Sequence, residues 1–314
     1  TLITYTYGVY VSNLHGCTVM LDPLLPPKKC PVDCVICPLG GTKIHLNKLS
    51  TPSPLVSKLL KDLEENKPRN VRMNTVMIWG FGDPLLIENV DDIVSKVAGL
   101  LRDEGIDAKI VLHSSLVYAR SVEKILSTVS SINVPYIWYG EDRRALGWIT
   151  SRSFADYLET LKHLSKLEKG KIVPELFIFR IGSEHYPSLD HLSETLVHLS
   201  RAGFEEVVVK PAERPSPGHS IKPPSPSYIE KVVEDLESKG FRAVPETTLI
   251  PESPFVWNNV YTSLYNHVLR IALRYDEVKF TYGDLGVIAL NNLISRRKIV
   301  LIHWGGTTFY KAII

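Results

Sequence analysis

Residues 75–112 read TVMIWGFGDPLLIENVDDIVSKVAGLLRDEGIDAKIVL and contain two apolar runs on either side of one helical pattern. The runs at 75–79 and 108–112 are short and apolar, as expected for strands that are buried on both faces. Between them, Asn89 precedes the helical pattern as a capping residue, and Gly105 ends it. A strand, a helix and a strand in this order predict a parallel βαβ unit with a right-handed crossover.

The same alternation continues along the chain. Further strands are predicted at 18–21, 134–139, 175–180 and 206–210, and further helices at 53–66, 153–170 and 188–203. In the first of these helices, Ser53 is the predicted N-cap and Pro54 the first helical residue. Roughly six βα units predict an α/β fold with a parallel sheet. Periodicity alone leaves two arrangements open, an open barrel and a flat, doubly wound sheet.

The rest of the chain is organised differently. The proline-rich stretch KPAERPSPGHSIKPPSPS at 210–227 is predicted to be a boundary or a lid, and it is followed by a helix at 228–239 and an irregular stretch to 256. The tail then reads as a helix at 261–275, short helices, and two strands around Gly305-Gly306, which is a hairpin signal. We therefore predict a small winged-helix-like α+β domain. The predicted divisions are a barrel over 1–227, a helix and linker over 228–256, and the winged-helix-like domain over 257–314.

Composition excludes several classes of protein. The chain has 314 residues, of which 44% are hydrophobic, and a net charge of +2. No run of about 18 apolar residues predicts a membrane-spanning helix, and the first residues do not resemble a signal peptide. We therefore expect a cytoplasmic protein with no membrane partner. The net charge is too small to indicate nucleic-acid binding by itself, and the absence of glutamine beside many lysines and glutamates is typical of a thermophile.

Three of the four cysteines lie close together in the loop KKCPVDCVICPLGG at 28–41. Thiolates at Cys30, Cys34 and Cys37 are spaced to hold three corners of one metal centre. One alternative is a [4Fe–4S] cluster with one iron left open for another ligand. The other is a zinc site with His45 as the fourth ligand, and three small buried hydrophobic residues are the non-metal interpretation. Cys17 stands alone and is interpreted as a core thiol.

This Cys-x3-Cys-x2-Cys loop after a first strand resembles the radical S-adenosylmethionine (SAM) superfamily. The surrounding sequence resembles a prokaryotic family of radical SAM iron–sulfur oxidoreductases that is related to the wyosine-forming tRNA enzyme. The similarity is strongest over 7–42 and 80–86. The positions that match the family pattern around the cysteines are Tyr7-Gly8, Ser12, Gly16, Asp22-Pro23, Lys28, Asp33 and Leu39-Gly40.

The resemblance implies an open, partial TIM-type (β/α)6 barrel and a site for two cofactors. It implies that Cys30, Cys34 and Cys37 ligate three irons of one [4Fe–4S] cluster, and that the fourth iron binds the amino and carboxylate groups of SAM. One electron from a ferredoxin- or flavodoxin-like donor then cleaves SAM, and the resulting 5′-deoxyadenosyl radical abstracts a hydrogen from the substrate. Ile36 stands where the family has an aromatic residue, so its contact with adenine is expected to be apolar packing.

A glycine-rich turn, WGFGDPLL at 79–86, follows the predicted strand 75–79. It is similar to the superfamily's Gly-Gly-Glu-Pro motif, whose backbone receives the SAM amino group. The resemblance therefore places residues 80–84 in the SAM site, with Asp83 in place of the usual glutamate. The residues concerned are Gly80, Phe81, Gly82, Asp83 and Pro84.

Polar runs follow four other strands, at 113–115, 139–144, 180–185 and 210–215. The carboxyl ends of parallel strands carry the active site in α/β folds, so this shared location indicates an enzyme. Further SAM-binding candidates are Ser114, Glu141, Asp142 and Arg180. Candidates for catalysis or substrate binding are His113, Arg143, Lys210 and Arg214.

Basic residues outnumber acidic ones in the tail, and a basic winged helix is able to contact nucleic-acid phosphates. The cations concerned are Arg270, Arg274, Lys279, Arg296, Arg297, Lys298 and Lys311. The alternatives are docking on the barrel and dimerisation. We predict a radical SAM enzyme that acts on an unknown substrate, with RNA or a nucleotide as one class. The two other hypotheses are a zinc-stabilised nucleic-acid-binding module and a non-catalytic Fe–S or SAM-binding scaffold.

Overall fold

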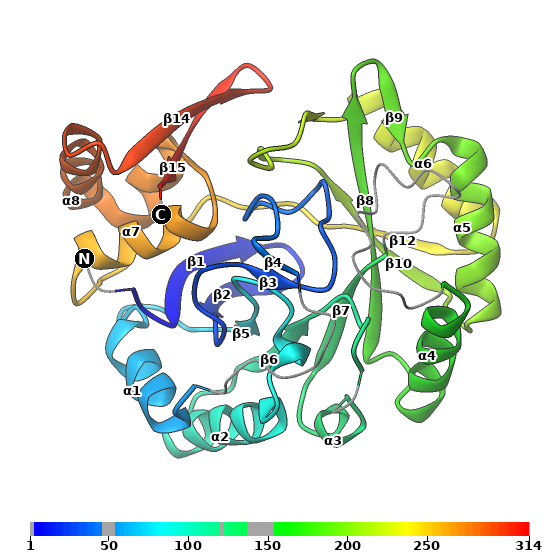
Figure 1. Cartoon of the computed structure of the whole chain (residues 1–314), viewed down its shortest axis with the longest axis horizontal. Helices are drawn as coiled ribbons and strands as arrows, with labels where there is room; N and C mark the ends of the chain where they lie inside the picture. Colours follow the sequence, from blue (N-terminus) through cyan, green and yellow to red (C-terminus); the bar gives the residue numbers. More distant parts are fainter. Residues whose placement is uncertain (1–2, 46–53, 120–121, 137–153, 314) are drawn as a thin grey trace.

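The computed structural model describes residues 3–45, 54–119, 122–136 and 154–313. Its main sheet has the strand order β1-β2-β5-β6-β7-β8-β10-β12. Strand β1 pairs antiparallel with β2, and every later neighbour on this path is parallel. The sheet curls into a half-barrel with helices on its outside (Figure 1). The strands are β1 (Thr6–Ser12), β2 (Gly16–Leu21), β5 (Thr75–Ile78), β6 (Lys109–His113), β7 (Ser131–Tyr136), β8 (Ile172–Ile181), β10 (Glu206–Pro211) and β12 (Arg242–Pro245).

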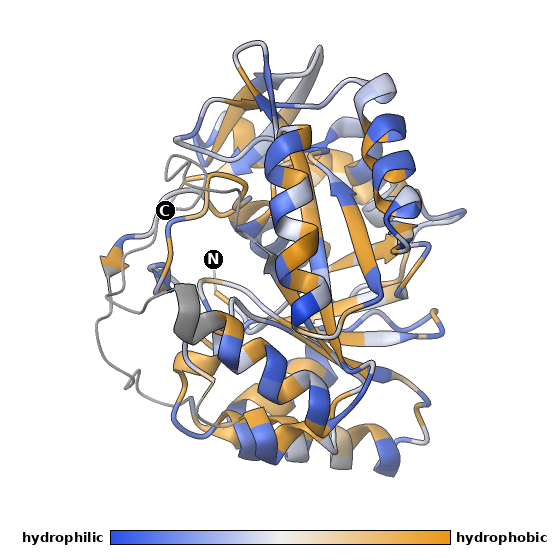
Figure 2. Cartoon of the chain, turned by 90° about the vertical axis from the view of Figure 1, so that its right-hand side faces the viewer, coloured by the Kyte–Doolittle hydropathy of each residue, from blue (hydrophilic) through white to orange (hydrophobic). Residues whose placement is uncertain are grey.

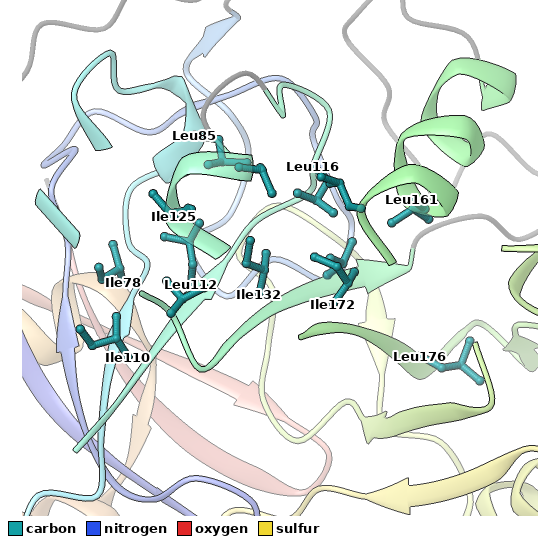
Figure 3. Close-up of a cluster of buried hydrophobic side chains, with 14 of the residues drawn as sticks. Ile78, Leu85, Ile110, Leu112, Leu116, Ile125, Ile132, Leu161, Ile172 and Leu176 are labelled. Carbon is teal, nitrogen blue, oxygen red and sulfur yellow. The ribbon is translucent and has the colours of Figure 1, made fainter. Parts of the chain in front are cut away.

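Six helices lie along the outer face of the half-barrel. They are α1 (Val56–Asn66), α2 (Val90–Asp103), α3 (Val122–Leu126), α4 (Phe154–Leu167), α5 (Leu189–Arg201) and α6 (Pro226–Ser238). The strands are largely hydrophobic, whereas these outer helices combine hydrophobic and hydrophilic residues (Figure 2). Alternate strand residues such as Ile78, Leu112 and Ile132 point outward and join one core with helix residues such as Ile125 and Leu161 (Figure 3). Burial of this apolar surface is the main force that fixes the helices on the sheet.

A strand is present at each of the six predicted apolar runs, although residues 137–139 of the fourth lie outside the described residues, and the curled sheet is consistent with a partial TIM barrel. The prediction of an irregular stretch after residue 239 is wrong at β12, which extends the parallel sheet beyond β10. The predicted start of the first helix is also wrong. Helix α1 begins at Val56 with Leu55 at the N-cap position and no side-chain cap. The proposed cap, Ser53, lies outside the described residues.

Five short elements complete this part of the chain. The cysteine loop contains the parallel pair β3 (Lys29–Cys30) and β4 (Ile44–His45), and a 3₁₀ turn, η1 (Pro84–Leu86), follows the glycine-rich loop. Strands β9 (Glu184–Tyr186) and β11 (Ile221–Lys222) pair antiparallel with the end of β8. The proline-rich stretch 210–227 therefore returns to the sheet at β11.

The C-terminal segment has its own small sheet. Its elements are α7 (Val260–Arg270), β13 (Leu273–Arg274), α8 (Tyr275–Ser295), β14 (Ile299–Trp304) and β15 (Thr307–Ala312). Strands β14 and β15 form the predicted hairpin, and both turn glycines, Gly305 and Gly306, have positive φ. Helix α8 is broken at Gly283, whose φ of 67° interrupts the helical geometry. The winged-helix assignment remains a prediction.

The C-terminal segment packs against the inner face of the first strands, beside β1 (Figure 1). Met20 and Met77 alternate with the outward-facing residues of β2 and β5, and they share a core with Leu264 and Val268 of α7. Helix α7 is buried over the whole stretch 263–270.

Two of the predicted surface cations of the tail are in fact in the interior. Arg270 is fully buried, and Lys311 is 7% exposed. The prediction that these two side chains contact nucleic acid is therefore wrong, because α7 packs against β1 and β15 packs against α7. Four of the listed cations are exposed, namely Lys279, Arg296, Arg297 and Lys298. Within the described part of the chain, no helix combines the length and the apolar character that crossing a membrane requires.

Candidate functional site

One cavity lies at the carboxyl ends of β5 and β6, beneath the cysteine loop. It is lined by most of the residues that the sequence pointed to, namely Cys30, Cys34, Ile36, Cys37, Gly80, Gly82, Asp83, His113 and Ser114. The structure adds Lys28 and Trp79 near the loops, and Pro135 and Phe177 on the inner face of β7 and β8. The cysteines and the glycine-rich loop, which are 43 residues or more apart in sequence, are thus brought to one place.

Hydrogen bonds hold the cysteine loop in a compact shape. The backbone N of Cys37 donates to the O of Cys34 over 3.1 Å, and the N of Gly40 donates to the O of Cys37 over 3.0 Å. From the proline-rich stretch, Ser216 Oγ donates to the O of Cys37 over 2.7 Å. The ammonium of Lys28 donates to the O of Gly40 over 2.6 Å. These bonds hold the loop whose three cysteines line the cavity.

The electrostatics of the thiols favours a bound cation. Burial raises the pKa of Cys34 to about 12, and the negative charge of Cys37 adds to the rise. Burial likewise raises the pKa of Cys30 well above its usual range. Burial alone would lower the pKa of Lys28, but the three neighbouring cysteines outweigh it and hold this pKa above its ordinary value. Three thiolates at this site therefore need more positive charge than one lysine supplies, and a metal centre would provide it.

The spacing of the sulfur atoms bears on the choice between zinc and an iron–sulfur cluster. Four sulfurs around one zinc lie about 3.8 Å apart, given Zn–S bonds of about 2.3 Å and tetrahedral geometry. Among the described residues, the one group of three ligand atoms within 4.8 Å of one another is His15, Glu175 and Glu246, and the three thiols are not such a group. A cubane cluster binds its cysteines at separate corners and so fits a wider spacing. The side chain of His45, the predicted fourth zinc ligand, lies outside the described ones.

The glycines of the 80–82 turn allow the cysteine loop to lie directly on it. A Cβ on Gly82, whose φ is +135°, would stand 1.6 Å from the backbone O of Lys29. A Cβ on Gly80 would stand 1.9 Å from the side chain of Asp22. The N of Lys29 also donates to the O of Phe81 over 2.9 Å. Only glycine permits this close approach of the two loops.

The carboxylate of Asp83 is buried, and it organises the loop after β6. Its Oδ1 accepts from Ser114 Oγ over 2.7 Å and from the N of Leu85 over 3.0 Å. Its Oδ2 accepts from the N and the Oγ of Ser115 over 2.9 and 2.5 Å. Asp83 therefore cross-links the two loops that line the cavity. Ser115, which sequence reasoning missed, belongs to the same HSS run as the predicted Ser114.

Beneath the cavity, the interior of the half-barrel contains a buried network of charged side chains. The carboxylate of Glu175 lies 2.9 Å from Nε2 of His113 and accepts from Nδ2 of Asn133 over 2.9 Å. Burial would raise the pKa of Glu175, but Lys210 and then His113 outweigh it and hold this pKa well below its usual range. Glu175 is therefore an anion, and it orients His113, whose ring lines the cavity and packs edge-on against Trp79.

Lys210 is part of this network. Its Nζ lies 3.5 Å from Glu175 and 3.1 Å from Glu246, and these two charges raise its pKa despite burial. Lys210 stays a predicted catalytic or substrate-binding residue, and two glutamates balance its charge. The ammonium of Lys210 therefore takes the position that a metal ion bound by Glu175 and Glu246 would need. Sequence reasoning missed Glu175 and Glu246. A lone glutamate within the apolar run IVPELFIF was the available signal for the first, since a buried charge needs a partner.

The remaining predicted site residues are placed as follows. Phe81 and Pro84 are buried, and neither lines the cavity. Arg180 lies beyond it at the end of β8, where its Nε donates to the O of Pro223 over 2.9 Å. Arg214 pairs with Glu277 of α8 over 2.9 Å, so it fastens the C-terminal segment instead of facing the cavity. The other candidates, Glu141, Asp142 and Arg143, lie outside the described residues.

No model of a known protein family matches the sequence, and no curated protein matches it significantly. Among solved structures, the chain is similar to a radical SAM methyltransferase from Sphaerobacter thermophilus, with 16% sequence identity and a TM-score of 0.54. It is also similar to SuiB from Streptococcus suis, alone and bound to S-adenosylmethionine, with 13% identity and TM-scores of 0.48 and 0.47.

The alignments cover about three quarters of this chain. The methyltransferase alignment covers 73% of this chain and 65% of the methyltransferase. The SuiB alignments cover 72% of this chain and 50% or 51% of SuiB. The chain therefore spans about two thirds of the first of these proteins and half of the second. At 16% identity, the similarity to the methyltransferase establishes a shared fold.

Proposed function

We propose that this chain is a radical SAM enzyme that binds one [4Fe–4S] cluster through Cys30, Cys34 and Cys37, with SAM beside it. The observation that carries the proposal is that these cysteines and the glycine-rich loop line one cavity at the carboxyl ends of the strands. The fold that the chain shares with a radical SAM methyltransferase supports the proposal. The cluster, when bound, supplies the electron that cleaves SAM reductively.

The protein's own residues would bind and orient the cofactors and exclude water. The three cysteines would ligate the cluster, and Lys28 would balance part of its negative charge. The bare backbone of 80–82 would lie against the amino end of SAM, and Ile36 would pack against adenine. The apolar wall formed by Val32, Leu39 and Phe177 would keep water from the reactive part of the cavity.

The substrate and the partners extend this proposal. The resemblance over 7–42 and 80–86 favours a relative of the wyosine-forming tRNA enzyme. That enzyme carries a second cluster, for which this chain has only Cys17 left, so we propose a different reaction. The exposed cations Arg296, Arg297 and Lys298, which follow α8 in the winged-helix-like segment, favour RNA as the substrate class. A ferredoxin- or flavodoxin-like protein is the proposed electron donor, and the cytoplasm the proposed compartment.

The test is anaerobic reconstitution with iron and sulfide, followed by incubation of the reduced protein with SAM. We expect a brown protein with four irons per chain, as one [4Fe–4S] cluster requires, and release of 5′-deoxyadenosine measured by mass spectrometry. Cys34→Ala should abolish both iron retention and SAM cleavage. The matched control is Cys17→Ala, which also removes a buried thiol but should retain the iron.

The other outcomes identify the alternative functions. A colourless protein with one bound zinc would contradict the enzyme and favour the zinc-stabilised nucleic-acid-binding module. A protein that binds both cluster and SAM but releases no 5′-deoxyadenosine would favour the non-catalytic scaffold. Iron retained in Cys34→Ala but lost in Cys17→Ala would overturn the ligand assignment.

A further inference from the structure

A buried ion pair connects the C-terminal segment to the cavity. Nε of Arg270, the last residue of α7, lies 2.8 Å from Oδ2 of Asp22, which follows β2. Both side chains are 0% exposed, although the residues are 248 positions apart in the chain. A fully buried ion pair is costly to desolvate, and removal of one partner leaves the other charge unpaired in the interior. Such a contact therefore fixes its surroundings strongly.

The other oxygen of Asp22 holds both loops of the candidate site. Oδ1 accepts from the backbone N of Leu24 over 3.0 Å and of Leu25 over 3.3 Å, at the start of the segment that leads to the first cysteine. The same oxygen accepts from the N of Phe81 over 3.1 Å, inside the glycine-rich loop. The side chain also fills the space that a Cβ on Gly80 would need. One carboxylate thus fixes the cysteine loop relative to the glycine-rich loop.

Arg270 is itself held on every side, so it fixes the orientation of the carboxylate. Its Nη2 donates to the O of Thr4 over 2.7 Å, and its Nη1 donates to the O of Asn266 over 3.1 Å. Its guanidinium lies 4.5 Å from the ring centre of Tyr7 and 5.3 Å from that of Phe81. A lysine could neither make this fork of hydrogen bonds nor stack in the same way.

We propose that Arg270 is a positioning residue, through which the C-terminal segment orders the cysteine loop and the glycine-rich loop by way of Asp22. The assignment of these loops to cofactor binding rests on the function proposed above, whereas the link between them rests on the contacts of Arg270 and Asp22. The C-terminal segment then contributes to the cofactor site, whether or not it also binds a partner.

The test measures thiol reactivity in the metal-free full-length chain, so it does not depend on the cofactors. Cys30 and Cys34 in the loop and Cys17 in β2 are all buried to about the same degree, at 9%, 9% and 8% exposure. Their alkylation by iodoacetamide, followed residue by residue by mass spectrometry, reports how often each site opens. In Arg270→Met we expect the rates at Cys30 and Cys34 to rise at least about tenfold relative to the rate at Cys17, which corresponds to about 1.4 kcal/mol.

The control is Tyr282→Phe. It removes a buried hydrogen bond to Nδ1 of His267 within the same segment, 2.9 Å long, without touching Asp22. This variant should leave the ratio of loop to Cys17 reactivity unchanged. Asp22→Asn should raise the ratio as Arg270→Met does. The double variant should add little beyond either single change, because both substitutions break the same contact between Asp22 and Arg270.

An equal acceleration at all three cysteines, or no acceleration, in Arg270→Met would overturn the proposal and leave Arg270 a general stabiliser. If Arg270→Met does not fold, Arg270→Lys decides the same question, because it keeps the charge and loses the fork. A raised loop ratio supports the link, and an unchanged ratio refutes it. Failure to bind a cluster or SAM would instead count against the proposed function and would leave the reactivity ratio as it is.

Discussion

Replacement of Gly82 with alanine tests whether the cysteine loop is locked onto the glycine-rich loop. The added Cβ would lie 1.6 Å from the backbone O of Lys29, and real Cβ contacts essentially never fall below 3.0 Å. The segment that carries Cys30 would therefore have to retreat by about 1.4 Å, which is the difference between these two distances. The φ of +135° at Gly82 is also one that other residues rarely adopt.

The steric contact of the added Cβ and the positive φ both contribute to the expected loss of stability. Backbone strain at such a φ costs about 1–3 kcal/mol, and overpacking in a close contact costs about the same. We therefore expect Gly82→Ala to lower the unfolding free energy of the metal-free chain by about 4 kcal/mol, a large part of a typical stability. The retreat of the loop should also break the hydrogen bond from the N of Lys29 to the O of Phe81.

The matched control is Gly99→Ala, in the middle of α2. A Cβ there meets nothing within 4 Å, and no positive φ is required. Alanine is favoured over glycine by about 1 kcal/mol inside a helix, so this variant should be slightly more stable. Urea unfolding of both variants measures the difference, and iron content after reconstitution measures the loop. A Gly82→Ala protein with unchanged stability and full iron content would refute the reasoning.

Two further variants test the buried polar groups. Burial, and then the charge of Arg270, lowers the pKa of Lys311 to about 7 from 10.5. Between these pH values the unfolded chain binds a proton that the folded chain does not, so stability should rise as the pH rises through this window. Lys311→Met should remove the rise and stabilise the protein at pH 7 by at most about 4 kcal/mol, and a flat wild-type profile in urea unfolding would contradict this. Asp83→Ala removes the acceptor shared by Ser114 and Ser115 and should lower the unfolding free energy by about 3 kcal/mol, whereas an unchanged urea midpoint would show that these bonds contribute nothing.

The fold could be predicted from the sequence where a local pattern is compatible with only one type of secondary structure. The apolar runs that became β5 and β6 are strands buried on both faces, and the helix between them has one apolar side. β12 was missed because its four residues are partly exposed and carry no run of apolar side chains. It is a strand only because β10 offers a free edge to pair with. Such an element is defined by its neighbour and not by its own residues.

The candidate site also has features that a local sequence pattern predicts and features that depend on distant residues. The cysteine spacing is a local signal, and the three thiols do line one cavity. The balance of charge at Lys210 is not local, since its partners lie 35 and 36 positions away, Glu175 on β8 and Glu246 just after β12. A single sequence records that a lysine ends a strand, but not which carboxylates the curled sheet brings to it. The role of a cation at a strand end therefore depends on the closure of the barrel.

The C-terminal cations show why a count of charges does not predict a binding surface. Arg270 and Lys311 belong to the same basic tail as Arg296 and Arg297, yet the first two are interior residues and the last two are exposed. The difference is whether the element has a face in water, and α7 has none over 263–270. A helix that buries polar residues over its whole surface has to satisfy them inside the protein. In α7 the arginine is satisfied by Asp22, and it thereby connects the tail of the chain to the loops that line the cavity.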